Sequence, residues 1–246
     1  MALLWFRQQG EDRYEVRSAG NSRRLYRNGV FHSQFNENRP FTGGVWDLLM
    51  LPAFFFTPGE IKRVLVLGVG GGAVIRQLQR YIMPEQIVGV DLDPLHLELA
   101  ARFFSVEDVE LECADAQAWL AEYQGEKFDL IIDDLFNEQQ GEPMRAVAMC
   151  EAWGERLLQH LAPGGAIVAN FVSSKELRQS ALYQSPQLQA HFPSIFCFTL
   201  KGYQNAIGGF LQRSVTTRQL RQQLRETIGE CPEYTVRTLT RVDVNG

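Results

Sequence analysis

The stretch RVLVLGVGGGAV (residues 63–74) joins an apolar run to a cluster of glycines. An apolar run without polar alternation is typical of a parallel strand that is buried on both faces. Glycines directly after such a strand allow a tight turn, and they let backbone N–H groups and a helix N-terminus approach a polar ligand. The pattern therefore predicts a buried strand, a glycine-rich turn and a helix from Ala73 to Tyr81.

The same alternation of strand and helix continues along the chain. Further strand patterns are QIVGVD (86–91), VELECA (109–114), FDLIIDD (128–134) and AIVANFV (166–172). Helix patterns separate them: one begins at the cap Asp93-Pro94, one is AQAWLAEY after Asp115, and one reaches Leu161. Strands that alternate with helices at this spacing predict a doubly wound, mostly parallel α/β sheet.

The two ends of the chain complete this prediction. Residues 11–40 carry short alternating runs with turns at Gly20-Asn21 and Asn28-Gly29, which indicate a small antiparallel β unit. After the fifth strand we expect a helix near 175–183, two β-rich runs and a last helix from about Thr217. We therefore predict a seven-stranded sheet, divided into an N-terminal β-hairpin unit with its connection (1–50) and the doubly wound domain (51–246).

Composition excludes several classes of protein. Twenty-four basic and 29 acidic residues give a net charge of −5, which argues against a nucleic acid partner. The longest apolar stretch, 45–56, is interrupted by Asp47 and Pro52, and no signal peptide precedes it, so we expect a cytoplasmic protein without a membrane partner. Scattered cysteines and isolated histidines argue against a disulfide framework, a metal site and histidine-based catalysis: Cys113, Cys150, Cys197, Cys231, His32, His96, His160 and His191.

Carboxylates follow three of the predicted strands. Asp91 lies 21 residues after Gly70, where a carboxylate can accept both hydroxyls of a ribose. Asp115 can accept from an adenine amino group, cap the next helix, or do both. Of the adjacent Asp133 and Asp134 only one can face the crevice, where it could deprotonate an acceptor or remain a plain strand-end charge. Trp46, Trp153 and Tyr203 could line a pocket, although lone aromatics more often belong to the core.

The segments VLVLGVGGGAVIRQL, VGVDLDPLHLELAARFF, LECADAQAWL and FDLIIDDL resemble, in order and spacing, the spermidine synthase family of polyamine aminopropyltransferases. The resemblance runs from about Arg63 to Phe171, and RNGVFHSQF and GYQNAIGGFL extend it more weakly. It implies the class I S-adenosylmethionine-dependent methyltransferase fold, S-adenosylmethionine or its decarboxylated form without a metal, a small-molecule acceptor and a homodimer. It also assigns roles to single residues: the turn to Gly68, Gly70 and Gly72, the ribose side to Asp91 and Leu92, the adenine side to Asp115 and Ala116, and catalysis to Asp134.

The chain departs from this family on the acceptor side. Gly71 stands where the family has the aspartate of GGGDGG, and Asn137 stands for the second acid of its D-x-x-D motif. The tyrosine of the family's Y-x-E-M stretch is missing from VWDLLM (45–50). We therefore expect a methyltransferase, with two alternatives: an aminopropyltransferase that uses displaced acids such as Glu138 or Glu142, and a non-catalytic nucleoside-binding or scaffold protein. A nicotinamide-dependent oxidoreductase fits less well, because it would leave Asp115 and the acids of 128–134 unused.

Overall fold

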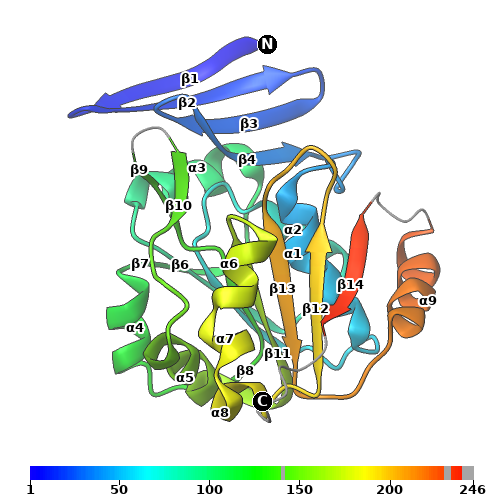
Figure 1. Cartoon of the computed structure of the whole chain (residues 1–246). Helices are drawn as coiled ribbons and strands as arrows, with labels where there is room; N and C mark the ends of the chain where they lie inside the picture. Colours follow the sequence, from blue (N-terminus) through cyan, green and yellow to red (C-terminus); the bar gives the residue numbers. More distant parts are fainter. Residues whose placement is uncertain (140–141, 230–233, 240–246) are drawn as a thin grey trace.

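The computed structural model describes residues 1–139, 142–229 and 234–239, and it places a small N-terminal sheet across one end of a large central sheet (Figure 1). The small sheet is antiparallel, and its strands follow one another in sequence order: β1 (Ala2–Gln9), β2 (Asp12–Ala19), β3 (Ser22–Arg27) and β4 (Val30–Asn36). Asn28 and Gly29 both have positive φ, which confirms the predicted hairpin turn. The first strand, β1, was not predicted.

The central sheet has the strand order β14-β12-β13-β11-β8-β5-β6-β7 in the described residues. The pairs from β11 to β7 are parallel, and β12, β13 and β14 join as antiparallel partners. The strands of this sheet are β5 (Arg63–Leu67), β6 (Gln86–Asp91), β7 (Glu110–Cys113), β8 (Phe128–Asp133), β11 (Leu161–Phe171), β12 (Ser194–Thr199), β13 (Ala206–Leu211) and β14 (Thr235–Leu239). The doubly wound, mostly parallel fold is thus confirmed, with eight described strands instead of the predicted seven.

Helices cover both faces of this sheet. Successive strand residues point to opposite faces, so the apolar strands supply side chains to a core on each side. In β5, Val64 and Val66 enter one core, whereas Leu65 and Leu67 enter the other. The helical segments are α1 (Val45–Met50), η1 (Leu51–Phe55), α2 (Ala73–Tyr81), α3 (Pro94–Phe104), α4 (Ala116–Glu122), α5 (Glu151–His160), α6 (Ser174–Gln179), α7 (Ala181–Gln184), α8 (Pro186–Gln189) and α9 (Thr217–Ile228). No helix among them is long and apolar enough to cross a membrane.

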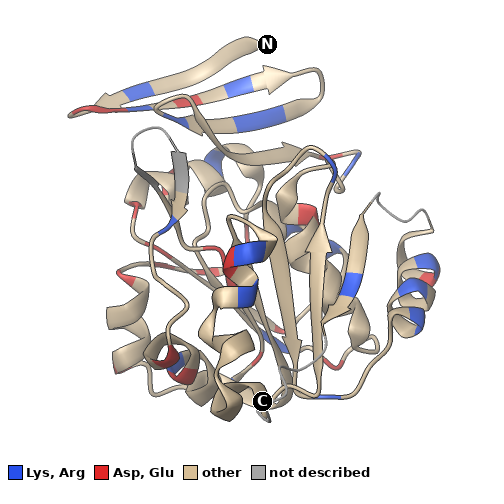
Figure 2. Cartoon of the chain, in the orientation of Figure 1, with Lys and Arg blue, Asp and Glu red and all other residues tan. Residues whose placement is uncertain are grey.

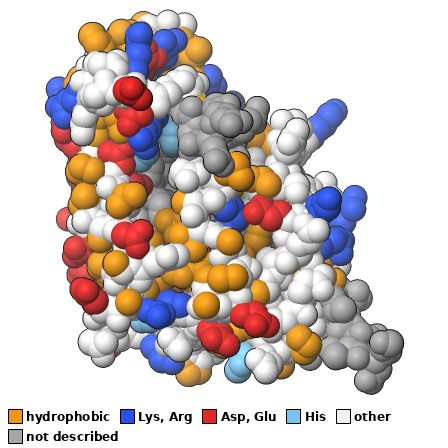
Figure 3. Space-filling model, turned by 60° about the vertical axis from the view of Figure 1, so that its left-hand side comes forward, with side chains coloured by type: hydrophobic (Ala, Val, Ile, Leu, Met, Phe, Trp, Pro, Cys, Tyr) orange, Lys and Arg blue, Asp and Glu red, His pale blue; other side chains and the backbone are white. Residues whose placement is uncertain are grey.

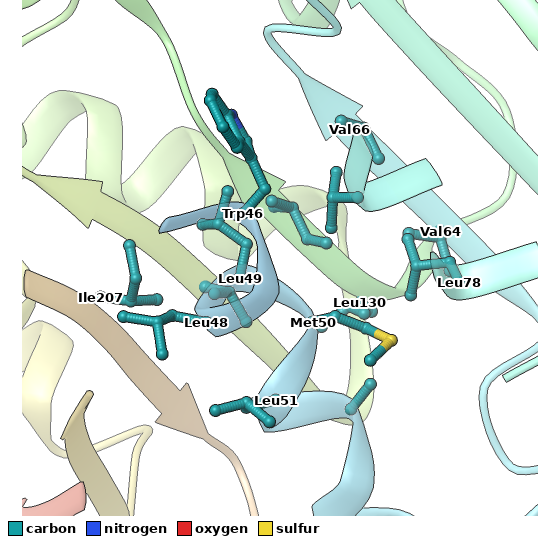
Figure 4. Packing of buried hydrophobic residues seen from close by; sticks show 14 of the residues in the cluster. Trp46, Leu48, Leu49, Met50, Leu51, Val64, Val66, Leu78, Leu130 and Ile207 are labelled. Atoms are coloured by element: carbon teal, nitrogen blue, oxygen red, sulfur yellow. The ribbon is translucent and has the colours of Figure 1, made fainter. Parts of the chain in front are cut away.

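The apolar stretch at residues 45–56 fills the first of these cores. All side chains of α1 are buried, and Figure 4 shows Leu49 and Met50 close to Leu130 of β8 and to the residues of β5. Asp47 is buried with them, and it accepts N–H groups from Gly43 and Gln77. The division of the chain near residue 50 stays a prediction, and α1 packs with the central sheet.

Three further elements differ from the sequence prediction. A short hairpin of β9 (Phe136–Gln139) and β10 (Glu142–Arg145) lies between β8 and α5, where no strand was predicted. The predicted helix near 175–183 is broken into α6 and α7 at Ser180, which has extended backbone angles. Strand β14 pairs with β12 beyond the last helix and accounts for the eighth strand.

The N-terminal sheet docks on α3 through an apolar cluster and several polar contacts. Trp5 packs against Phe103 with ring centroids 6.1 Å apart. Arg7 forms an ion pair with Glu98 at 3.0 Å, and Arg23 donates to the carbonyl of Phe103 at 2.7 Å. These contacts hold the small sheet over the carboxyl end of β5, where the candidate site lies.

Candidate functional site

The glycine-rich turn between β5 and α2 follows the predicted geometry. Gly68 has φ +86°, and a Cβ at this position would lie 2.3 Å from the carbonyl oxygen of Asp134. Gly72 has φ +75° and caps α2, and a Cβ there would meet Val106 at 2.3 Å. Only glycine fits both positions, because other residues would combine an unfavourable φ with a steric clash. The turn therefore brings β5, β8 and the first turn of α2 into close contact.

Asp91 holds this turn in place. Its Oδ2 accepts the N–H groups of Val69 and Gly70, both at 2.9 Å, and its Oδ1 accepts the N–H of Asp93 at 2.9 Å. Burial alone would raise the pKa of this carboxyl, but the neighbouring His96 and the backbone donors outweigh burial and lower it. Asp91 is thus a buried anion whose Oδ1 accepts one backbone N–H group, whereas its Oδ2 accepts two.

The predicted adenine-side residues lie at the next strand end. Asp115 caps α4, and its Oδ1 accepts the N–H of Ala118 at 2.9 Å. The side chain is exposed, so its second oxygen stays accessible. Ala116 is buried in the first turn of α4, whereas Leu92 is 71% exposed beside Asp91. The capping role of Asp115 is confirmed, and its contact with an adenine stays a prediction.

The adjacent acids at the end of β8 point to opposite sides. Asp133 is fully buried, and its Oδ2 accepts from Arg145 and from the indole N–H of Trp153, both at 2.8 Å. Asp134 points the other way, and its Oδ1 accepts from the amide of Asn170 at 2.7 Å. Asp133 is thus committed to a buried ion pair with Arg145, whereas the catalytic role of Asp134 stays a prediction.

The surroundings of Asp134 disfavour its charged form. Burial raises the pKa of this carboxyl to about 7, the negative charges of Asp133 and Asp91 add to this effect, and the hydrogen bond from Asn170 opposes it. Asn170 is itself held, since its Oδ1 accepts from Asn205 at 3.0 Å. Asn170 follows the same pattern as the other polar residues at strand ends, so the sequence could have indicated it, whereas Asn205 gave no such signal.

The N-terminal sheet also contributes to the site, which the sequence did not indicate. A Cβ at Gly71 would lie 2.6 Å from Cβ of Ser33, and one at Gly70 would lie 3.3 Å from the carbonyl oxygen of His32. The rings of His32 and His96 are 5.1 Å apart, so the expectation of isolated histidines is wrong for this pair. Figure 3 looks onto this side of the molecule, where histidine side chains lie deep in a hollow near its upper end.

The remaining side chains named above divide between core and surface. Trp46 and Trp153 are buried in the two cores, as lone aromatics usually are, whereas Tyr203 is 37% exposed. Basic residues recur along the N-terminal sheet and on α9 (Figure 2). In the described part of the chain, no group of three or more His, Cys, Asp or Glu side chains could hold a metal ion. Asn137 is exposed, and the side chains of Glu138 and Glu142 lie outside the described residues.

Comparison with known sequences agrees with this geometry. Residues 64–165 match a family described as "Methyltransferase domain". The Polyamine aminopropyltransferase 2 of Caldanaerobacter subterraneus subsp. tengcongensis is 30% identical over 133 residues, which are 52% of this chain and 44% of that protein. The aligned part thus spans less than half of this relative.

Two solved structures share the fold over most of this chain. A probable spermidine synthase from Corynebacterium glutamicum has a TM-score of 0.70 and 19% identity, and the match covers 97% of this chain and 90% of that one. A spermidine synthase in complex with the transition-state analogue AdoDATO has a TM-score of 0.66 and 13% identity. That match covers 95% of this chain and 80% of the other. Sequence and fold together confirm the resemblance to the spermidine synthase family.

Proposed function

We propose that this spermidine synthase-like chain is an S-adenosylmethionine-dependent transferase that methylates a small-molecule acceptor. The observation that carries the proposal is the difference between the two halves of the site. The glycine-rich turn and Asp91 are arranged to receive a nucleoside, whereas the position of the family's amine-binding acid is a glycine that packs against Ser33.

The nucleoside half consists of groups that are already fixed before a ligand binds. Asp91 is ionised and held by three backbone N–H groups, so its Oδ1 can accept a ribose hydroxyl without reorganisation. Asp115 has a free carboxylate oxygen at the neighbouring strand end, where it would accept from the adenine amino group. These residues fit an adenosyl group, and the fold that the chain shares with spermidine synthases is consistent with such a ligand.

The other half of the site disfavours an aminopropyl group. An aspartate at position 71 would need the space that Ser33 fills, because even its Cβ would lie 2.6 Å from Cβ of Ser33. Asn137 adds no charge at the second family position. A cationic amine would therefore lose two charge-assisted contacts, each worth about 1.5–3 kcal/mol. S-adenosylmethionine itself has a carboxylate at this end and does not need those acids.

Asp134 would act on the acceptor. S-adenosylmethionine supplies a sulfonium with an activated methyl carbon. As the acceptor's nucleophilic atom bonds to that carbon, the carbon–sulfur bond breaks and its electron pair stays on sulfur. The free Oδ2 of Asp134 would take the acceptor's proton, and a pKa of about 7 suits a base that works near neutral pH. Asn170 keeps the carboxylate aimed during this step.

Aminopropyl transfer is the second candidate, because the relatives' names favour it. The matched curated protein is a polyamine aminopropyltransferase, and the matched structures are spermidine synthases. In that reaction the same nucleoside half would bind decarboxylated S-adenosylmethionine, and another acid would have to hold the amine. A homodimer is part of either proposal.

Calorimetry on the full chain separates these candidates. We expect S-adenosylmethionine and methylthioadenosine to bind, and decarboxylated S-adenosylmethionine to bind no more tightly than S-adenosylmethionine. A preference of tenfold or more for the decarboxylated form, with conversion of putrescine, would establish aminopropyl transfer instead. Binding of NAD without binding of any adenosyl sulfonium or thioether would refute the whole proposal.

A further inference from the structure

Asp93 connects the N-terminal sheet to the start of α3. Its Oδ1 caps the helix by accepting the N–H of Leu95 at 2.9 Å. Its Oδ2 accepts the hydroxyl of Tyr14, which lies on β2, at 2.5 Å. Burial and the contact with Asp93 raise the pKa of Tyr14, so the hydroxyl stays a hydrogen-bond donor. A residue of the small sheet thus fixes the second oxygen of a helix cap beside the site.

His96 stands between this cap and Asp91. Its Nδ1 faces Oδ1 of Asp91 at 3.6 Å, and its Nε2 faces Oδ2 of Asp93 at 3.8 Å. The residue is 6% exposed, and the ring of Tyr14 packs edge-on against its ring with centroids 5.9 Å apart. His32 packs against the same imidazole, and burial together with the charge of His96 lowers the pKa of His32 to about 4, so that His32 is neutral at physiological pH. Four neighbours therefore determine where the His96 ring lies.

The position of the ring matters because of the oxygen that it faces. Oδ2 of Asp91 already accepts two backbone N–H groups, whereas Oδ1 accepts one. Oδ1 is consequently the atom that a ribose hydroxyl would use, and His96 is the side chain next to it. A polar group at this place influences the orientation of the Asp91 carboxylate and the negative charge on its Oδ1.

We propose that His96 is a positioning residue for the nucleoside site, and that Tyr14 of the N-terminal sheet holds it there through Asp93. The proposal rests on the proposed role of Asp91 as the ribose acceptor. His96 does not touch the ligand in this scheme. It keeps Oδ1 of Asp91 turned toward the ligand, and through it the N-terminal sheet becomes part of the nucleoside site.

Titration calorimetry of the full chain with methylthioadenosine tests this proposal. His96→Leu keeps the volume of the ring and removes its polar atoms, whereas His96→Gln keeps a donor for Asp91. We expect binding to weaken about tenfold for His96→Leu, about fivefold for Tyr14→Phe and less than about threefold for His96→Gln, as hydrogen bonds of ordinary strength imply. Tyr26→Phe is the matched control, since it removes from the same sheet a hydroxyl that donates to Sδ of Met1, and it should leave binding unchanged.

The order of the two His96 variants separates positioning from packing. A leucine suits a buried site at least as well as a glutamine, so a purely structural role would leave His96→Leu binding as well as His96→Gln, and that result would overturn the proposal. If His96→Leu does not fold, Tyr14→Phe retains the test, because it changes a single atom. Asp91→Ala separates a failure of the positioning role from a failure of the proposed function. If Asp91→Ala weakens binding and the His96 and Tyr14 variants do not, only the positioning role of His96 fails. If Asp91→Ala has no effect on binding, the proposed function fails.

Discussion

Replacement of Asp134 by asparagine should make the protein more stable at pH 8 and less active. The fold raises the pKa of this carboxyl from 3.8 to about 7, mainly by burial. A folded pKa above the unfolded value means that the native state prefers the protonated acid, so the ionised carboxylate costs stability as the pH rises from about 4 through 7. The rise of roughly three pKa units corresponds to an upper limit of about 4 kcal/mol. The residue as a whole is only partly buried, so water screens part of the charge and we expect about 1–2 kcal/mol.

Urea unfolding at pH 8 and pH 5 measures this effect without any knowledge of the acceptor. Asp134→Asn keeps an oxygen that can accept from Asn170, so the packing is preserved while the charge is removed. The free energy of unfolding of the variant should exceed that of the parent by about 1–2 kcal/mol at pH 8. This difference should fall by more than half at pH 5. In an assay with an acceptor, turnover should drop by about 10²-fold or more, the usual contribution of a general base. A variant that is less stable than the parent at both pH values would refute the reasoning that ionised Asp134 destabilises the fold.

Three other substitutions test the remaining parts of the site. Asp91→Ala should weaken methylthioadenosine binding by about 1.5–3 kcal/mol in calorimetry, and unchanged affinity in a folded variant would remove Asp91 from the ribose site. Asp133→Asn should lower the unfolding free energy by about 3 kcal/mol, because it leaves the buried guanidinium of Arg145 without its ion-pair partner, and denaturant titration checks this. Gly68→Ala should cost about 3 kcal/mol in the same titration, since its Cβ would lie 2.3 Å from the carbonyl oxygen of Asp134; a neutral result would mean that the turn adapts.

The features that the sequence predicted well follow from local rules. The helix from Ala73 to Tyr81 has the bounds of α2, because the glycines and the apolar period define its two ends. Asp93-Pro94 and Asp115 begin α3 and α4 by accepting helix N–H groups, as their residue types indicate. The opposite directions of Asp133 and Asp134 follow from strand alternation alone.

The features that the sequence missed depend on contacts between distant segments. His32 and His96 are 64 positions apart in the chain, and only the docking of β4 beside α3 brings their rings within 5.1 Å. Strand β14 has four exposed or half-exposed residues and forms because β12 offers an open edge. No local sequence pattern predicts such pairings, since the stabilisation comes from contacts with the partner segment and not from the segment itself.

The division between matched and unmatched segments explains why the chemistry is harder to assign than the fold. Residues 64–165, which match the methyltransferase domain, contain Asp91 and Asp115, the proposed nucleoside contacts, and also Asp134. Ser33, which occupies the space beside Gly71, and Asn170, which orients Asp134, lie outside that range. The side chain that fills the space beside Gly71 thus comes from β4, and the one that orients Asp134 comes from the carboxyl end of β11. Selection of the transferred group in this chain should accordingly change with substitutions in β4, and use of the acceptor with substitutions at the end of β11, while substitutions in the glycine-rich turn should weaken all adenosyl ligands alike.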